Sequence, residues 1–367
     1  MAVLSFEKRE ASAGARAEVA EILARNGVKW LQLTYHKTPT VPATLFDIGV
    51  GFVRGILNRL NEPVFLLHAR SYIAGTMALA LQRVVKAPLL FDMRGFWADE
   101  RVEGGSWSRE GPIYRVMKQL ERRLFASAAG VVSLTETGRE ELLTWPVVRR
   151  RGTPVEVIPT CADLSRFGGI AEQDRRGPLT IGYLGSMGGR YLIDETVRLF
   201  AEIRRARPDA RLLVLTPRDQ SILWDACHAH DVPSDVVRAE AVPNSEVPKR
   251  LAQVSATISL IKPGFSSLAS CPTKFGESLA AGCPVVVNPG IGDCASVVLG
   301  HRVGVVAELS HGRFEATAAH LLALVGEGPP TRQRCAITAD RLFSLETGID
   351  RYAALYSRLT TEPESIA

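Results

Sequence analysis

Short apolar, β-branched segments alternate with longer helix-like segments along almost the whole chain. The expected strands are 2–6, 28–34, 64–67, 89–91, 130–134, 155–158, 179–184, 211–215, 236–239, 256–261, 284–287 and 304–306. The expected helices between them are 11–26, 71–85, 113–128, 136–143, 193–206, 220–229, 246–253, 273–281 and 314–325. Strands that alternate with helices in this way form parallel sheets covered on both faces. The pattern therefore predicts an α/β fold.

The chain has 367 residues, more than one hydrophobic core usually supports. A polar, Gly- and Arg-rich stretch at 167–178 divides the pattern into two blocks of similar size. We therefore predict two Rossmann-like, doubly wound domains, 1–168 and 178–344, that face each other. Open α/β sheets bind ligands beyond the carboxyl ends of their strands, so the cleft between the domains is the expected site.

Several classes of protein are excluded by what the sequence lacks. We find no apolar run of the ~20 residues that a membrane-spanning helix needs, and no signal peptide at the start. The six cysteines form no C-x-x-C pair and have no histidine at metal-ligand spacing, so we expect free thiols, no metal and a cytoplasmic protein. No nucleic-acid-binding module is present.

Charge is distributed unevenly along the chain. Residues 1–177 carry a net charge of +6 and residues 178–367 a net charge of −1. This asymmetry indicates either an anionic partner of the first half or an arginine-rich solvated surface. The segment 112–127 combines apolar and cationic residues in an amphipathic pattern. Its two interpretations are peripheral contact with an anionic membrane and an ordinary surface helix packed on its own sheet.

The most informative segment is 271–293, which predicts a loop, a short helix from Thr273, a tight turn and a strand. Lys274 and Glu277 are three residues apart and so project from one face of the helix. A carboxylate there can accept hydrogen bonds from a ribose diol, and the N–H groups at the helix start suit a diphosphate. The glycine-rich loop that follows the strand allows close approach of a ligand.

This segment resembles the donor-side signature of family 4 glycosyltransferases, P-x-K-x-x-E-x-x-A-x-G-x-P-V-V. The matching residues are Pro272, Lys274, Glu277, Ala280, Gly282, Pro284, Val285 and Val286. The segments 157–167, 181–194 and 343–356 resemble, in order, the family's exit from the first domain, its phosphate-facing loop and its closing helix. The likeness covers about 64–359.

The resemblance implies the GT-B fold and transfer of a hexose-type sugar from a nucleotide-diphosphate (NDP) sugar, with retention and without a metal. It also implies that a helix at about 345–360 crosses back to the first domain. Glu277 would hold the ribose, while cationic side chains and the 185–189 backbone would neutralise the leaving diphosphate. The expected donor-binding residues are Gly185, Ser186, Gly188, Gly189, Arg190, Lys262, Thr273, Lys274, Phe275 and Glu277.

The chain departs from the family pattern at several positions. Many relatives carry a second glutamate where this chain has Ala269, and an Arg and a Lys where it has Ser186 and Tyr191. Family histidines at two strand ends of the first domain are replaced by Arg70 and Arg94.

The candidate catalytic residues follow the strands of the first domain. They are His68, Arg70, Asp92, Arg94, Asp99 and Glu100. We expect Asp92 and Arg94 to contact sugar hydroxyls or phosphate, unless they form a structural ion pair. We expect Asp99 or Glu100 to orient or deprotonate the acceptor.

By analogy with the family, the acceptor would be a glycan, a lipid-linked sugar or a small molecule, as in polysaccharide biosynthesis. Two alternatives stay open. One is a catalytically inactive, NDP-sugar-binding scaffold subunit, because arginines replace the family histidines. The other is a different GT-B enzyme, such as a sugar-nucleotide epimerase.

Overall fold

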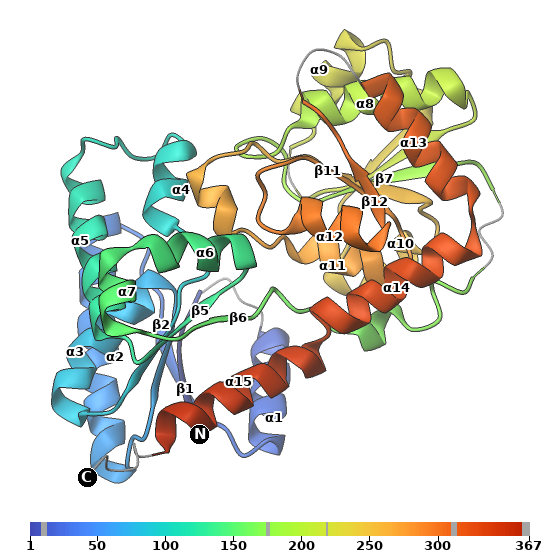
Figure 1. Ribbon diagram of the computed structural model, residues 1–367. Helices are drawn as coiled ribbons and strands as arrows, with labels where there is room; N and C mark the ends of the chain where they lie inside the picture. Colours follow the sequence, from blue (N-terminus) through green and yellow to red (C-terminus); the bar gives the residue numbers. More distant parts are fainter. Residues whose placement is uncertain (9–12, 174–176, 218, 310–313, 362–367) are drawn as a thin grey trace.

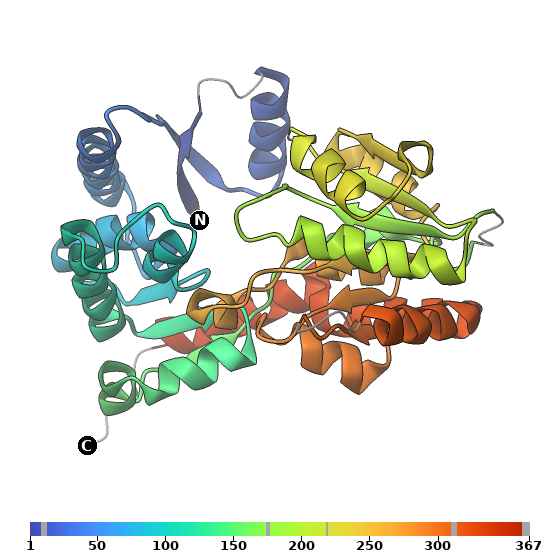
Figure 2. The same ribbon diagram turned by 90° about the horizontal axis from the view of Figure 1, so that it is seen from above.

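Three parallel sheets make up the framework of the protein, seen here in a computed structural model (Figure 1). The structure describes residues 1–8, 13–173, 177–217, 219–309 and 314–361. Residues 174–176, in the expected linker, lie outside the described residues. The sheets belong to two lobes that lie side by side, as the view from above also shows (Figure 2). The α/β class with parallel sheets in two Rossmann-like halves is thereby confirmed.

The C-terminal sheet has six strands in the order β12-β11-β10-β7-β8-β9. The strands are β7 (Thr180–Leu184), β8 (Arg211–Leu215), β9 (Val237–Glu240), β10 (Ala256–Ser259), β11 (Val285–Val287) and β12 (Gly304–Val306). Helices α8 (Ile193–Ala206), α9 (Ser221–Ala229) and α13 (Phe314–Gly326) pack on one face. Helices α10 (Val247–Leu251), α11 (Thr273–Ala280), α12 (Cys294–His301) and α14 (Pro329–Phe343) cover the other face. The strands are apolar on both sides because both faces are buried.

The N-terminal strands form two separate sheets. The larger contains β3 (Leu67–Arg70), β4 (Leu89–Asp92), β5 (Gly130–Ser133) and β6 (Val155–Val157), in that order. The smaller pairs β1 (Ala2–Glu7) with β2 (Lys29–Thr34). The helices of this half are α1 (Ala13–Arg25), α2 (Thr40–Asn61), α3 (Ser71–Val85), α4 (Trp97–Glu103), α5 (Pro112–Ser127), α6 (Glu136–Thr144) and α7 (Pro146–Arg151).

The last helix, α15 (Leu345–Thr360), returns from the C-terminal lobe to the N-terminal one (Figure 1). Ser344 caps its first turn by accepting a hydrogen bond from the Thr347 N–H at 3.1 Å. Leu355 is 2 % exposed and packs with Leu90, Val132 and Ile158 of the N-terminal sheet region. The helix therefore covers one face of that sheet.

The helices α2, α4, α7, α12 and α14 were not predicted, and β3 lies three residues later than expected. The largest omission is α2, which has 22 residues. Among the described residues it is the one helix that is long and apolar enough, by length and composition, to cross a membrane. The expectation that no such run exists was therefore wrong. Its position in the fold is considered below.

Candidate active site

The carboxyl ends of β3 and β4 bring four of the candidate residues together. The strands pair in parallel, with His68 opposite Leu90 and Arg70 opposite Asp92. Along β3, His68 and Arg70 are accessible and Ala69 is buried, so His68 and Arg70 share one side of the strand. These side chains thus occupy the edge of the sheet where α/β proteins bind ligands.

Asp92 is held by the last helix of the chain. Its carboxylate accepts a hydrogen bond of 2.9 Å from the Tyr352 hydroxyl, and His68 Nε2 lies 3.9 Å from the same oxygen. Tyr356, one turn later in α15, lies 2.6 Å from His68 Nδ1. Burial raises the pKa of Tyr352, and the adjacent Asp92 adds to this effect. Neither tyrosine was among the predicted site residues.

One oxygen of Asp92 has no hydrogen-bond partner among the described residues. Asp92 is 1 % exposed, and its Oδ1 atom is buried without a protein donor. An unsatisfied carboxylate oxygen is costly to bury, so its persistence calls for an explanation. A ligand hydroxyl or a water molecule that donates to Oδ1 would satisfy it. The ion pairs of the described residues do not include one between Asp92 and Arg94.

Arg94 lies on a tight turn directly after β4. Its φ angle is +60°, in the left-handed region, and the next residue, Gly95, has φ +128°. This backbone conformation is uncommon for a residue with a side chain. The guanidinium lies 3.4 Å from Thr160 Oγ1. Burial raises the pKa of Tyr352 and of Cys271, and the charge of Arg94 opposes this effect at both groups, so Arg94 is close enough to both to act on them electrostatically.

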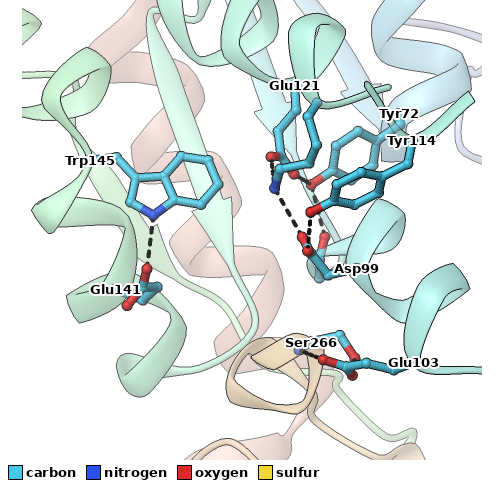
Figure 3. Close-up of polar contacts among 10 residues, drawn as sticks. Tyr72, Asp99, Glu103, Tyr114, Glu121, Glu141, Trp145 and Ser266 are labelled. Carbon is cyan, nitrogen blue, oxygen red and sulfur yellow. Dashed lines mark hydrogen bonds and ion pairs between the residues drawn. The ribbon is translucent and has the colours of Figure 1, made fainter. Parts of the chain in front are cut away.

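The acids of α4 point in different directions. Asp99 is 2 % exposed, and its two oxygens accept hydrogen bonds from the Tyr114 hydroxyl at 2.8 Å and Lys118 Nζ at 2.9 Å (Figure 3). Lys118 also pairs with Glu121, which is fully buried and accepts a hydrogen bond of 2.8 Å from Tyr72. The expectation that Asp99 faces the acceptor therefore needs correction. Consecutive helical residues are about 100° apart, so Asp99 and Glu100 do not share a face.

Glu100 and Glu103, one turn apart on α4, contact the C-terminal lobe instead. Glu100 Oε1 lies 3.2 Å from Arg190 Nη1. Glu103 accepts hydrogen bonds from the Ser266 N–H, at 3.1 Å, and from its hydroxyl (Figure 3). Glu103 was not among the residues predicted from the sequence, because its contact with Ser266 joins segments 163 residues apart.

The loop after β7 supports the candidate donor-binding side chains. Gly185, Gly188 and Gly189 have φ angles of +122°, +77° and +65°, and Tyr183 fixes the turn by donating a 2.6 Å hydrogen bond to the Ser186 carbonyl. Lys274 lies directly against this loop. A Cβ atom added at Gly185 would be 1.7 Å from Lys274 Nζ, so glycine is required there.

The cations of the C-terminal lobe meet around the same loop. Lys274 Nζ lies 4.2 Å from the centroid of the Tyr191 ring. Arg190 donates hydrogen bonds to Ser267 Oγ at 2.8 Å and Ser270 Oγ at 3.1 Å. The Arg190 carbonyl accepts a 2.7 Å hydrogen bond from the N–H of Lys262, which is exposed. The structure thus brings Arg190 and Lys274 together with the glycine loop and places the backbone of Lys262 next to Arg190.

Helix α11 divides its residues between the site and the core. Thr273 is its exposed first residue, and Glu277 is half-buried. Burial raises the pKa of Glu277, while the charges of Arg166 and Lys274 oppose this effect. Phe275 is 1 % exposed, and its ring packs edge-on against Phe343 at 5.6 Å. The expectation that Phe275 contacts the donor is corrected accordingly, because Phe275 points about 100° away from Lys274 into the core.

The segment before α11 packs into the N-terminal lobe. Within the short helix η4 (Phe265–Ala269), the Phe265 ring lies 4.6 Å from the Phe96 ring. Ala269 is fully buried and would be 2.9 Å from a Cβ atom at Gly138 in α6. The position where many relatives carry a glutamate is therefore part of an apolar contact between the lobes.

Loop 289–293 makes a second contact between the lobes. The Asp293 carboxylate accepts hydrogen bonds from the N–H groups of Glu136 and Thr137 at 2.6 and 3.0 Å. It therefore caps the start of α6 together with Thr135, whose hydroxyl accepts from Gly138 N. A cavity of about 120 Å³ lies beside this contact, between Pro159, Cys271 and Arg351. Ligand pockets usually measure ~300 Å³ or more, so this cavity is too small for an NDP-sugar.

Comparisons with known proteins agree with this architecture. Residues 5–161 match the family described as glycosyl transferase 4-like domain. No curated protein sequence matches the chain. The structure resembles sucrose-phosphate synthase from Thermosynechococcus elongatus, with a TM-score of 0.68 and 14 % identity over 98 % of both chains.

Two further solved structures have the same fold. A glycosyltransferase from Rickettsia africae gives a TM-score of 0.66 with 12 % identity over 99 % of both chains. Anabaena HepE, solved with UDP and glucose, gives 0.62 with 12 % identity over 92 % of this chain and 88 % of HepE. Identities this low establish the fold alone. The N-terminal lobe therefore matches a glycosyl transferase 4-like domain, and the chain as a whole has the GT-B fold of these glycosyltransferases.

Proposed function

We propose that the protein transfers a hexose-type sugar from an NDP-sugar to a glycan, lipid-linked or small-molecule acceptor, with retention and without a metal. The observation that carries the proposal is the contact of Lys274 with Gly185, which places a fixed cation on a glycine loop beside Arg190 and Lys262. Fixed charge and N–H donors are what a departing diphosphate needs, since its negative charge grows in the transition state.

The C-terminal lobe would bind the nucleotide. Glu277 lies one turn after Lys274 on the same helix face, so its carboxylate can accept hydrogen bonds from the ribose hydroxyls. Thr273 and the N–H groups of Ser186, Gly188 and Gly189 would contact the diphosphate, while the N–H of Gly185 is bonded to the Leu215 carbonyl at 2.8 Å and holds the loop. Solved structures of the same fold contain UDP and glucose, or UDP and N-acetylglucosamine, which supports a sugar nucleotide as the ligand.

The N-terminal lobe would act on the sugar and the acceptor. Asp92 Oδ1 lacks a donor and is placed to accept from a ligand hydroxyl. Arg70 and Arg94 supply positive charge at the same sheet edge, and His68 is oriented by Tyr356. Glu100 remains the candidate for contact with the acceptor, although its ion pair with Arg190 would first have to open.

Calorimetric titration with UDP, GDP and ADP is the direct test, followed by incubation of each corresponding NDP-sugar with the protein. We expect one nucleotide to bind wild-type protein and to bind Lys274→Ala at least tenfold more weakly. Lys249→Ala, an exposed lysine of the same lobe, is the matched control. Absence of binding by every nucleotide would overturn the proposal.

Product analysis by NMR separates the remaining alternatives. Slow release of the sugar without acceptor, with the same anomeric configuration, supports a retaining transferase. Nucleotide binding with no turnover indicates an inactive binding subunit, and an epimerised NDP-sugar indicates an epimerase.

A further inference from the structure

Helix α2 packs inward mostly through small residues, and several of its large apolar residues are exposed. Ala43, Asp47 and Gly51 are its buried residues, at intervals of four. Gly51 packs so closely on α3 that a Cβ atom there would lie 2.3 Å from Met77 Sδ, and Gly55 would similarly meet Leu81 at 2.7 Å. This close approach of two helices leaves no room for larger side chains on the inner face.

The outer face of α2 is an apolar stripe with nothing covering it among the described residues. Its exposed large residues are spaced three or four apart within two groups that the exposed Gly49 separates, and the most accessible are Leu45, at 64 %, and Leu60, at 76 %. The stripe consists of Val41, Leu45, Val53, Leu57 and Leu60. A water-facing helix normally has the opposite arrangement, and a contiguous exposed apolar surface indicates a partner or a membrane.

The exposed charges on this side of the N-terminal lobe are mostly positive; the acid directly after α2, Glu62, is also exposed and pairs with Lys29 at 2.8 Å. Helices α2, α3, α5 and α7 lie on the side of the N-terminal lobe remote from the C-terminal sheet (Figures 1 and 2). The only acids on these four helices are Asp47 and Glu121, and both are buried. Their exposed cations, with Lys86 at the end of α3, are Arg54, Arg59, Arg83, Arg115, Arg122, Arg123, Arg149, Arg150 and Arg151.

We propose that this surface docks the protein on an anionic phospholipid bilayer, with α2 lying in the plane of the interface. An apolar stripe flanked by arginines is the pattern of helices that insert shallowly into the headgroup region. Helix α2 does not cross the bilayer, because its inner face is packed on α3 and Asp47 is hydrogen-bonded to the His36 N–H at 3.0 Å.

The positive charge of this surface also disfavours self-association of the protein through it. A second copy of the chain seated face to face on the stripe would bring like-charged arginines together without an exposed acid from these helices to pair with them. The proposal goes beyond the transferase activity, since docking needs neither nucleotide nor acceptor. An experiment that contradicts membrane docking therefore leaves the proposed transferase activity untouched, and the reverse also holds.

Flotation with lipid vesicles tests the proposal. We expect the full chain to float with vesicles that contain about one third phosphatidylglycerol, and not with pure phosphatidylcholine vesicles. The double variant Val53→Gln, Leu57→Gln should reduce the partition coefficient at least tenfold. Leu299→Gln, Ile337→Gln is its matched control, because these residues are exposed apolar positions of the C-terminal lobe.

A second pair of variants tests the contribution of the arginines to membrane binding. Arg54→Gln, Arg59→Gln should weaken partitioning roughly 30-fold, about fivefold for each cation. Arg205→Gln, Lys249→Gln lowers the net charge equally on the other lobe and should have little effect. Thermal melts and nucleotide titrations of all four double variants show whether each is folded.

Three outcomes would overturn the proposal. They are absence of flotation, equal flotation with neutral vesicles, and equal partitioning of the stripe variant and its control. Analytical ultracentrifugation could give a fourth outcome that overturns the proposal. A dimer that Val53→Gln, Leu57→Gln abolishes would show that a second copy covers the stripe.

Discussion

Tyr352 donates its hydroxyl hydrogen bond to Asp92 over 2.9 Å, and these residues are 260 positions apart in the sequence. The contact joins the last helix to the edge of the N-terminal sheet where the candidate catalytic side chains lie. Asp92 is almost fully buried, so this bond is a large part of what stabilises its carboxylate.

Removal of that hydroxyl tests the relationship. Tyr352→Phe should lower the free energy of unfolding by about 1–3 kcal/mol, because a buried carboxylate loses a donor. Turnover should fall more than donor affinity, since Asp92 lies with the candidate catalytic residues of the N-terminal lobe, whereas the nucleotide would bind to the C-terminal lobe. Denaturant titration and steady-state kinetics measure the two effects. Tyr356→Phe, which leaves the Asp92 bond intact, is the control, and equal effects of both substitutions would contradict the role of Tyr352.

Glu277→Gln tests the contact with the ribose. The amide keeps the size of the side chain but removes its charge, so hydrogen bonds from ribose hydroxyls lose about 1.5–3 kcal/mol. Nucleotide affinity should fall roughly 10- to 100-fold with the melting temperature little changed. Calorimetric titration measures the change in affinity, and Glu315→Gln, at an exposed position of α13, is the control. Wild-type affinity in Glu277→Gln would remove the residue from the site.

Gly185→Ala tests the packing of Lys274. The new methyl group would occupy the position of Lys274 Nζ, at a φ of +122° that alanine rarely adopts. We expect weaker nucleotide binding together with lower stability. Gly300→Ala is the contrasting change, because that helical glycine has open space around it and should gain up to about 1 kcal/mol. An unchanged nucleotide affinity of Gly185→Ala would show that the position of Lys274 does not matter for nucleotide binding.

Lys118→Met tests the buried network behind α4. The substitution leaves Asp99 and Glu121 without their shared cation, which should cost about 3–5 kcal/mol of stability. Unfolding by urea measures the loss, and Arg122→Gln, at the next exposed cation of α5, should be near neutral.

The pH dependence of the same variant follows from Glu121. Burial already raises the pKa of Glu121 above its unfolded value, and removal of Lys118 raises it further. The folded state then binds protons more readily than the unfolded state, so stability increases as the pH falls from 7 toward the unfolded pKa of about 4.3. A variant whose stability falls over this range would contradict the assignment.

The donor half of the site was predictable because its residues lie close together in sequence. Lys274 and Glu277 share a helix turn, and the glycine loop follows a strand with an unmistakable apolar pattern. Helical periodicity alone also predicts that Phe275 points away from Lys274 and Glu277. Phe275 directly follows Lys274, and an aromatic residue on that other side of the helix faces the core.

The rest depends on contacts between distant segments. Glu103 with Ser266, and Tyr352 with Asp92, exist only because the lobes and the last helix meet, and no local pattern encodes this. Helix α2 escaped prediction for another reason. Its inner face consists of Ala43, Asp47, Gly51 and Gly55, so the usual signal of large residues facing the core is inverted.

The return of α15 to the N-terminal sheet also constrains how the chain is assembled on the ribosome. The sheet is translated first, yet Leu355, which covers Leu90 and Val132, emerges only after all of the C-terminal lobe. Throughout that interval one apolar face of the nascent lobe stays open to water and to chaperones. The N-terminal lobe is therefore synthesised first but completes its folding last.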